Sequence, residues 1–233
     1  SLAQRRLRGF EALVRWNHPR LGRLPPSQFI PLAELSDVIR PLTLWILEEG
    51  LRQQHAWAEQ GHPTRLAINF SARHLLDDSC PEQIAALLSR QGTAAESLEL
   101  EITESALIAD PEHATATLER IRGLGVQIAV DDYGTGYSSL SHLRRLPLHA
   151  LKIDVSFVRN MLKSAQDRVI VESTVGLAHN LGLNVVAEGI EDEGTLAALR
   201  AMGCDEGQGY FIAPPMDPDE AGRWMHASPL ALH

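Results

Sequence analysis

The sequence has few cysteines and no long apolar run. Only two of its 233 residues are cysteines, Cys80 and Cys204, and neither lies in a CxxC or Cys/His spacing. A disulfide framework and a zinc site are therefore not expected. No apolar run approaches the ~20 residues of a membrane span, and the first residues lack the charged-then-apolar pattern of a signal peptide. We expect a cytoplasmic domain.

Positive charge is also scarce. The chain has 21 Lys and Arg residues against 30 Asp and Glu residues, so its formal net charge is −9. Binding to polymeric DNA or RNA rests on neutralising many phosphates with Lys and Arg, and the charge balance argues against it. A small phosphorylated ligand held through metal ions remains compatible with this composition.

Apolar and β-branched runs alternate with stretches of helical spacing. A composition of 44% hydrophobic residues suits a full core, and we expect one domain over 1–233. Seven runs predict strands, at 7–16, 65–71, 98–105, 126–134, 150–158, 183–191 and 207–215. Five stretches between them predict helices, at 42–61, 81–92, 110–125, 167–182 and 192–203. The alternation predicts an α/β fold of the (β/α)8 TIM-barrel type. A doubly wound open sheet is the alternative, although no GxGxxG turn follows the first strand.

Acids and amides fall on or just beyond these strands, mostly towards their C-terminal ends. Since those ends meet at one mouth in a parallel barrel, these residues are candidates for one site. They are Glu11, Asn69, Glu101, Asp131, Asp132, Asp154, Glu188 and Gln208.

Oxygen ligands without Cys or His favour Mg²⁺ or Mn²⁺ over zinc. Asp131 and Asp132 are adjacent, so both can reach the mouth only if the strand ends between them. Such a pair could serve two ions in the attack of water on a phosphodiester. Lys152 lies two positions before Asp154, so both should face one side of their strand. Lys152 could orient the attacking water, or it could form a structural salt bridge.

The glycine-rich loop "GTGYSSL" at 134–140 follows the aspartate pair. It could be a phosphate cradle or a plain turn. Gly134 and Gly136 permit a mobile backbone, and we favour a loop that couples metal binding to a partner interface.

Seven blocks of this sequence together resemble the EAL domains, which are phosphodiesterases that hydrolyse cyclic di-GMP. The blocks are "EALVRW", "NFS", "ELEITES", "DDYGTGYSSL", "LKIDVSFV", "VAEGIE" and "GQGYFIAPPM", in the family's order and over nearly the whole chain. The resemblance implies a modified TIM barrel with two Mg²⁺ or Mn²⁺ ions that opens cyclic di-GMP to linear pGpG.

Site residues carry over by position in these blocks. Glu11, Asn69, Glu101 and Asp131 match the primary metal ligands, and Asp132 matches the second-metal ligand. Glu188 matches the general base or a water-mediated metal contact, and Lys152 matches the lysine near the attacking water. The substrate-side residues are Leu13, Arg15, Asp154, Glu191 and Gln208. Glu104 resembles the glutamate that steadies the loop containing Gly134 and Gly136.

The resemblance also implies partners. The loop and helix over 131–147 contribute to a homodimer in the family, and sensory or GGDEF domains often flank the EAL domain, some in membrane-anchored proteins. EAL domains usually begin with a further strand that has a Gln-Pro block. Because this chain starts after it, we expect an N-terminally incomplete domain from a longer protein.

Two further functions stay open. Some EAL domains are cyclic di-GMP receptors without turnover, and these tend to lose the first-block Glu or one of the aspartates, which this sequence keeps. The other alternative is enolate stabilisation by a Mg²⁺-dependent barrel, which also uses acids at strand ends and a lysine.

Overall fold

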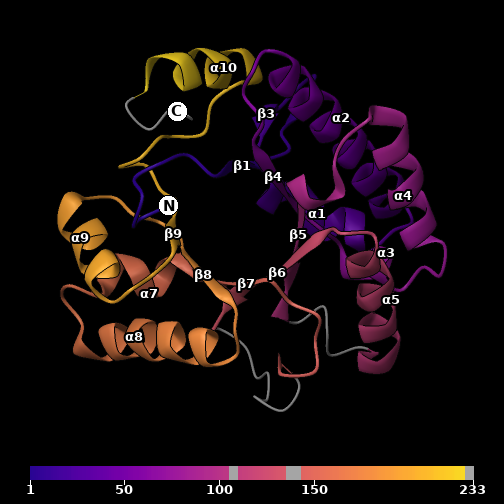
Figure 1. The fold of residues 1–233 in the computed structure, drawn as a ribbon. Helices are drawn as coiled ribbons and strands as arrows, with labels where there is room; N and C mark the ends of the chain where they lie inside the picture. Colours follow the sequence, from indigo (N-terminus) through magenta and orange to yellow (C-terminus); the bar gives the residue numbers. More distant parts are fainter. Residues whose placement is uncertain (105–109, 135–142, 229–233) are drawn as a thin grey trace. The chain divides into compact units, whose positions relative to one another are not determined.

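The structure is a computed structural model that describes residues 1–104, 110–134 and 143–228 (Figure 1). Contacts between residues divide the chain into two compact units. Unit 1 comprises Ser1–Arg8, Thr103–Ser105 and Ile128–His233, and unit 2 comprises Gly9–Ile102 and Ala106–Gln127. No helix among the described residues is both long and apolar enough to cross a membrane.

Unit 2 is built on three parallel strands. They are β1 (Gly9–Ala12), β4 (Arg65–Asn69) and β5 (Leu98–Thr103), in the order β1-β4-β5. Its helical elements are α1 (Pro26–Glu34), α2 (Ile39–Glu59), α3 (Ala72–Leu75), α4 (Cys80–Gln91), the 3-10 turn η1 (Ala95–Ser97) and α5 (Pro111–Gly123). The long helix α2 packs on β4 and α4, and the core buries Leu47, Ile68 and Leu100 completely. Gln54 of α2 donates to the carbonyl oxygens of Thr64 and Ser97, which fixes the starts of β4 and β5.

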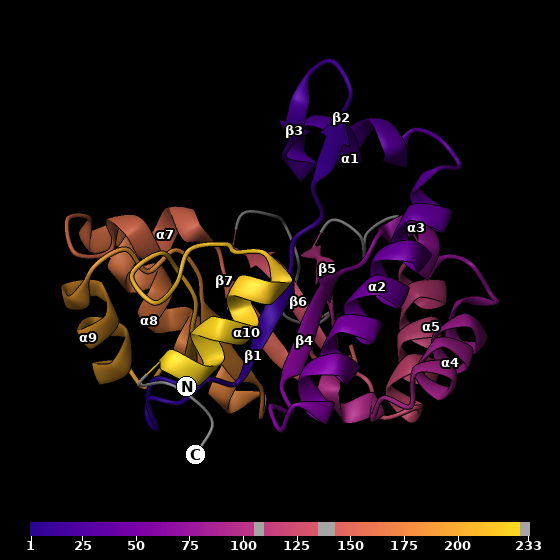
Figure 2. The ribbon, with the colours of Figure 1, turned by 90° about the horizontal axis from the view of Figure 1, so that it is seen from above.

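A small hairpin interrupts unit 2 after β1. The strands β2 (Trp16–His18) and β3 (Gly22–Leu24) pair antiparallel. Figure 2 shows this hairpin and α1 beyond the C-terminal end of β1, apart from the three parallel strands. Trp16 packs edge-on against Phe29 of α1, with ring centroids 5.8 Å apart.

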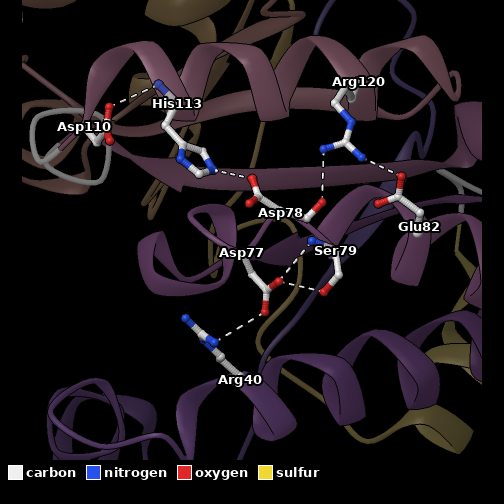
Figure 3. Close-up of polar contacts among 8 residues, drawn as sticks. All are labelled: Arg40, Asp77, Asp78, Ser79, Glu82, Asp110, His113 and Arg120. Carbon is white, nitrogen blue, oxygen red and sulfur yellow. Dashed lines mark hydrogen bonds and ion pairs between the residues drawn. The ribbon is translucent and has the colours of Figure 1, made fainter.

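A polar network ties α5 to the connection between α3 and α4 (Figure 3). Arg120 donates to the carbonyl oxygen of Asp78 and to Glu82, and His113 lies 3.3 Å from the Asp78 carboxylate. Asp110 caps the first turn of α5 by accepting from the His113 backbone amide. These contacts order the surface of unit 2.

Unit 1 contains four parallel strands in the order β6-β7-β8-β9. They are β6 (Gln127–Tyr133), β7 (Ala150–Ile153), β8 (Asn184–Ala187) and β9 (Glu206–Gly207). The helices are α7 (Val155–Asn160), α8 (Ala165–Asn180), α9 (Glu193–Ala201) and α10 (Pro218–Ala227). Helix α8 packs on β7, β8 and α7.

The predicted alternation of strands and helices is confirmed, but every strand is shorter than its predicted range, and the run at 183–191 yields only β8. Three further runs shorten as strongly. The run at 7–16 yields only β1, because the chain leaves the sheet after Ala12 and Trp16 joins the hairpin. The run at 150–158 becomes β7 followed by α7, whose first turn Asp154 caps. The run at 207–215 yields only the last residue of β9, since the backbone at Gly209 lies against that of Ile190 and two prolines follow.

Candidate functional site

Three predicted ligands lie side by side in unit 2. Asn69 is opposite Glu101 in the parallel register of β4 and β5, and Glu11 of β1 is opposite Ala67, two residues before Asn69. Because alternate strand residues share a face, the three side chains belong to one face. The Asn69 amide nitrogen donates to Glu11 Oε1 at 2.6 Å, and Glu101 is buried. The Asn69 side-chain carbonyl oxygen could therefore serve as a ligand together with the carboxylates of Glu11 and Glu101.

A buried ammonium organises the predicted acids of unit 1. Lys152 of β7 is 2% exposed, and its Nζ lies 2.5 Å from Glu188 Oε1 and 3.4 Å from Asp131 Oδ1. Glu188 directly follows β8, and its backbone amide bonds to Ile153 at the end of β7. A buried charge is stable only when it is paired, so Lys152 and the two carboxylates depend on one another.

Asp131 and Asp132 are held in a distorted part of β6. The prediction that the strand ends between them is wrong, because β6 continues to Tyr133. Instead its register against β7 shifts between Val130 and Tyr133, and Asp132 has a φ of 55°. Such a bulge can redirect a side chain without ending the strand, and a non-glycine residue at positive φ costs backbone energy. The Asp132 amide donates to Asp131 Oδ1 at 3.0 Å.

The pKa values of two acids in unit 1 are shifted in opposite directions. Burial, helped by the Asp131 charge and by a hydrogen bond with Asp154, raises the pKa of Asp132 to about 6, although Lys152 opposes the rise. Burial would also raise the pKa of Asp154, but hydrogen bonds from Ser156 outweigh it and hold that pKa below its usual range. A divalent cation can replace a proton held in this way, so these oxygens fit a hard metal ion.

Asp154 is a helix cap and not a strand residue. The expectation that it shares a strand face with Lys152 is therefore wrong, because β7 ends at Ile153. Asp154 Oδ1 accepts hydrogen bonds from the backbone amide and the hydroxyl of Ser156. The β-branched and aromatic letters of "VSFV" hid this helix start, although the spacing D-x-S is a capping signal.

The predicted substrate-side residues are spread over both units. In unit 2, Leu13 and Arg15 lie between β1 and β2, so Arg15 is not on a strand with Glu11 as the predicted strand at 7–16 implied. Arg15 donates to the Val14 carbonyl oxygen. In unit 1, the Gln208 backbone bonds to Ala187 and Ile190 beyond β8. Glu191 forms an ion pair with Arg159 at 2.6 Å.

The residues predicted to couple the loop lie partly outside the described ranges. Glu104 is buried. The pKa of Tyr133 is raised mainly by the burial of Tyr133 and further by the charge of Glu104, so Glu104 lies beside the end of β6. Gly134 has a φ of 100° and packs against Phe157. Gly136 and residues 135–142 of the predicted dimer segment 131–147 lie outside the described residues.

No three His, Cys, Asp or Glu side chains form a compact metal cluster in the described ranges. In unit 2 the group combines two carboxylates with an amide, and in unit 1 Lys152 already neutralises part of the charge. The donor chemistry fits Mg²⁺ or Mn²⁺, and the ligand set stays a prediction. Cys80 and Cys204 are both free and buried.

A sequence model of the EAL domain matches residues 1–215. The chain is 46% identical over 220 residues to the cyclic di-GMP phosphodiesterase PA2567 of Pseudomonas aeruginosa, an alignment that covers 94% of this chain and 38% of that protein. Cyclic di-GMP phosphodiesterase NbdA of the same organism is 42% identical over 217 residues, with 93% and 28% covered. The chain thus spans well under half the length of these relatives.

Solved structures give the same family. The PaMucR phosphodiesterase in complex with c-di-GMP matches with a TM-score of 0.88 and 38% identity, over 91% of this chain and 87% of that one. The EAL enzyme Bd1971 with cAMP and cyclic di-GMP bound matches with a TM-score of 0.91 and 31% identity, over 95% and 61%. These matches confirm the predicted α/β fold of the TIM-barrel type. The chain belongs to the EAL domain family.

Proposed function

We propose that this chain is a metal-dependent phosphodiesterase that hydrolyses cyclic di-GMP to linear pGpG. The observation that carries the proposal is Lys152, buried between Glu188 and Asp131 and next to the strained Asp132. A buried ion pair with a carboxylate of raised pKa beside it is typical of functional sites, and this supports a catalytic role for the group. The names of two relatives, PA2567 and NbdA, support the substrate.

The donor set supports Mg²⁺ or Mn²⁺, with two ions in the proposal. Glu11, Asn69, Glu101, Asp131 and Asp132 would hold the metal, and Glu188 would contact it directly or through water. When bound, such an ion polarises a phosphoryl oxygen and lowers the pKa of water.

In the proposed reaction, Glu188 accepts a proton and Lys152 stabilises the developing negative charge. Glu188 accepts the proton of the attacking water, whose oxygen bonds to phosphorus while the P–O3′ bond breaks. The departing O3′ takes a proton from solvent and becomes the 3′-hydroxyl, and Glu188 later returns its proton to solvent. The Lys152 ammonium holds Glu188 in place and stabilises negative charge on the water oxygen. Arg15 and Gln208, with Leu13, Asp154 and Glu191, are the proposed substrate contacts.

The test separates hydrolysis from binding. Cyclic di-GMP is incubated with the chain, with and without Mn²⁺ or Mg²⁺, and turnover is measured beside a binding titration in Glu188→Gln. This variant should bind the dinucleotide but lose turnover, since the amide cannot accept the proton. Binding by the wild-type chain without product under all metal conditions would instead identify a receptor.

We also propose flanking domains and a second copy of this chain as partners. The bifunctional diguanylate cyclase/cyclic di-GMP phosphodiesterase MucR is 38% identical to this chain, which covers only 31% of it. This supports a cyclase-type GGDEF domain beside the EAL domain. A flanking sensory domain and membrane anchoring of the full-length protein are further proposals. We also propose a homodimer through 131–147, and light scattering of the purified chain would test it.

A further inference from the structure

The segment after β8 has Glu188 at one end and Glu191 at the other. Its backbone is held by the chain beyond β9, because the Ile190 amide donates to the Gln208 carbonyl oxygen at 3.0 Å. The Phe211 amide in turn donates to the Ile190 carbonyl oxygen at 3.0 Å. Glu191 and Gln208, two of the proposed substrate contacts, therefore lie on neighbouring stretches of chain.

Helix α7 contacts the same segment. A Cβ placed on Gly189 would collide with the Val155 side chain at the start of α7. One turn further along this helix, Arg159 Nη2 lies 2.6 Å from Glu191 Oε1. No other hydrogen bond or ion pair of the Arg159 side chain involves a described residue. Within the described ranges, this guanidinium is thus committed to Glu191.

The charge of Glu191 opposes the binding of the proposed substrate. Cyclic di-GMP carries two negatively charged phosphodiester groups, and a carboxylate that faces them repels them unless a cation balances it. The Arg159 and Glu191 side chains are 51% and 49% exposed, so water weakens their attraction and the pair adds little to folding stability. Stability alone gives little reason for the pair, whereas an anionic ligand beside Glu191 does.

We propose that Arg159 is a positioning residue for substrate binding, whose guanidinium orients Glu191 and neutralises its charge when cyclic di-GMP binds. The inference rests on the proposed function, because it assigns the dinucleotide to the site that contains Glu191. Arg159 acts through Glu191 and not by its own contact with the substrate. A guanidinium suits this role, since it stays charged and its planar N–H donors match a carboxylate.

A double-mutant cycle tests whether Arg159 acts through Glu191. Arg159→Met and Glu191→Gln are made singly and together, and Arg159→Lys restores the charge. Arg52→Met is the matched control, because Arg52 pairs with Glu49 at 2.8 Å with side-chain exposures of 58% and 43%. Two measurements are made on the purified chain: Kd for cyclic di-GMP by titration in a Glu188→Gln background, and kcat and KM with Mn²⁺.

Arg159→Met should raise Kd and KM by about 3- to 10-fold with little change in kcat, because an unbalanced carboxylate then faces the anionic substrate. The same substitution should have no effect once Glu191→Gln has removed that charge. Arg159→Lys should recover most of the loss, and Arg52→Met should change neither constant. Added salt should reduce the loss in Arg159→Met, since it screens exposed charges.

Wild-type Kd and KM in Arg159→Met would overturn the proposal. A loss that persists in full in the Glu191→Gln background would also overturn it, since Arg159 would then act independently of Glu191. If the wild-type chain binds cyclic di-GMP without turnover, the proposed hydrolysis fails, while the cycle in Kd still decides the role of Arg159. A wild-type chain that neither binds nor cleaves the dinucleotide would overturn both proposals.

Discussion

At the scale of single residues, Lys152 is the group on which the others depend. Replacing it with methionine keeps an apolar side chain at its buried position but removes the ammonium that lies between Glu188 and Asp131. We expect kcat for cyclic di-GMP to fall by about 100- to 1,000-fold, because charge in the transition state loses a fixed donor.

Lys163 offers a matched control, since it is an exposed lysine in the same unit. Lys163→Met should leave kcat unchanged in steady-state assays of both variants under identical metal concentrations. A wild-type kcat in Lys152→Met would reduce Lys152 to a structural ion pair.

Asp132 makes the metal-free chain sensitive to pH. Its pKa is about 6 in the folded state against an ordinary value of 3.8, so the folded chain binds a proton more tightly than the unfolded chain between these values. Stability contributed by this group is therefore lost as pH rises from about 4 to 6, and the loss persists above pH 6. Asp132→Asn should melt a few degrees higher than wild type at pH 7.5 in EDTA.

The difference between the two melting temperatures should shrink towards pH 4.5 and reverse when Mn²⁺ is added at pH 7.5, because the amide is a poorer ligand. Thermal scans at both pH values provide the measurement. Equal melting temperatures of Asp132→Asn and the wild-type chain under all these conditions would contradict a raised pKa at Asp132.

Residue types and strand positions were enough to predict which residues lie at strand ends. Glu11, Asn69, Glu101 and the aspartate pair all lie on the strands expected. The bulge at Asp132 could not be predicted, because its positive φ depends on how β6 pairs with β7 and not on local propensity. The cap that Asp154 forms on α7 was also missed, although its spacing from Ser156 was visible.

At the scale of elements, the first turn of α7 fixes the segment after β8. Gly189 has a φ of 73°, and a side chain there would meet Val155. Gly189→Ala should therefore destabilise unit 1 by more than the ~1 kcal/mol of positive-φ strain alone. It should also lower kcat, because Glu188 is the preceding residue.

Gly182→Ala separates the two causes, since Gly182 has the same φ of 73° with no atom near its Cβ position. Chemical denaturation should give a larger loss for Gly189→Ala than for Gly182→Ala, and Val155→Ala should recover part of it. Equal losses at both glycines would show that the contact with Val155 does not matter.

Hydrophobic periodicity predicted the positions of the main helices well. Helices α2, α4, α5, α8 and α9 lie within a few residues of the predicted ranges. Strand lengths were less predictable, because "VSFV" has strand composition while the Asp154 cap and tertiary packing make it helical. The β2–β3 hairpin was missed since its three-residue strands are too short to show alternation.

At the scale of the whole molecule, a net charge of −9 and acids in both units predict strong coupling between metal and stability. At a free Mn²⁺ concentration of about 100 times the dissociation constant, the free energy of unfolding should rise by about 2.7 kcal/mol per site. Denaturation with Mn²⁺ and with EDTA measures the change. Glu101→Gln should show a smaller rise, and no rise in the wild-type chain would contradict the ligand assignment.

In the proposed reaction, water cleaves cyclic di-GMP with the help of a divalent cation. The most direct measurement is to incubate the chain with cyclic di-GMP in water enriched in ¹⁸O, first in EDTA and then with Mn²⁺ or Mg²⁺ restored, and to analyse the product by chromatography and mass spectrometry. We predict linear pGpG with one ¹⁸O atom in its terminal phosphate, formed only after the metal is restored. Intact cyclic di-GMP under every metal condition, or pGpG formed equally fast in EDTA, would contradict the account.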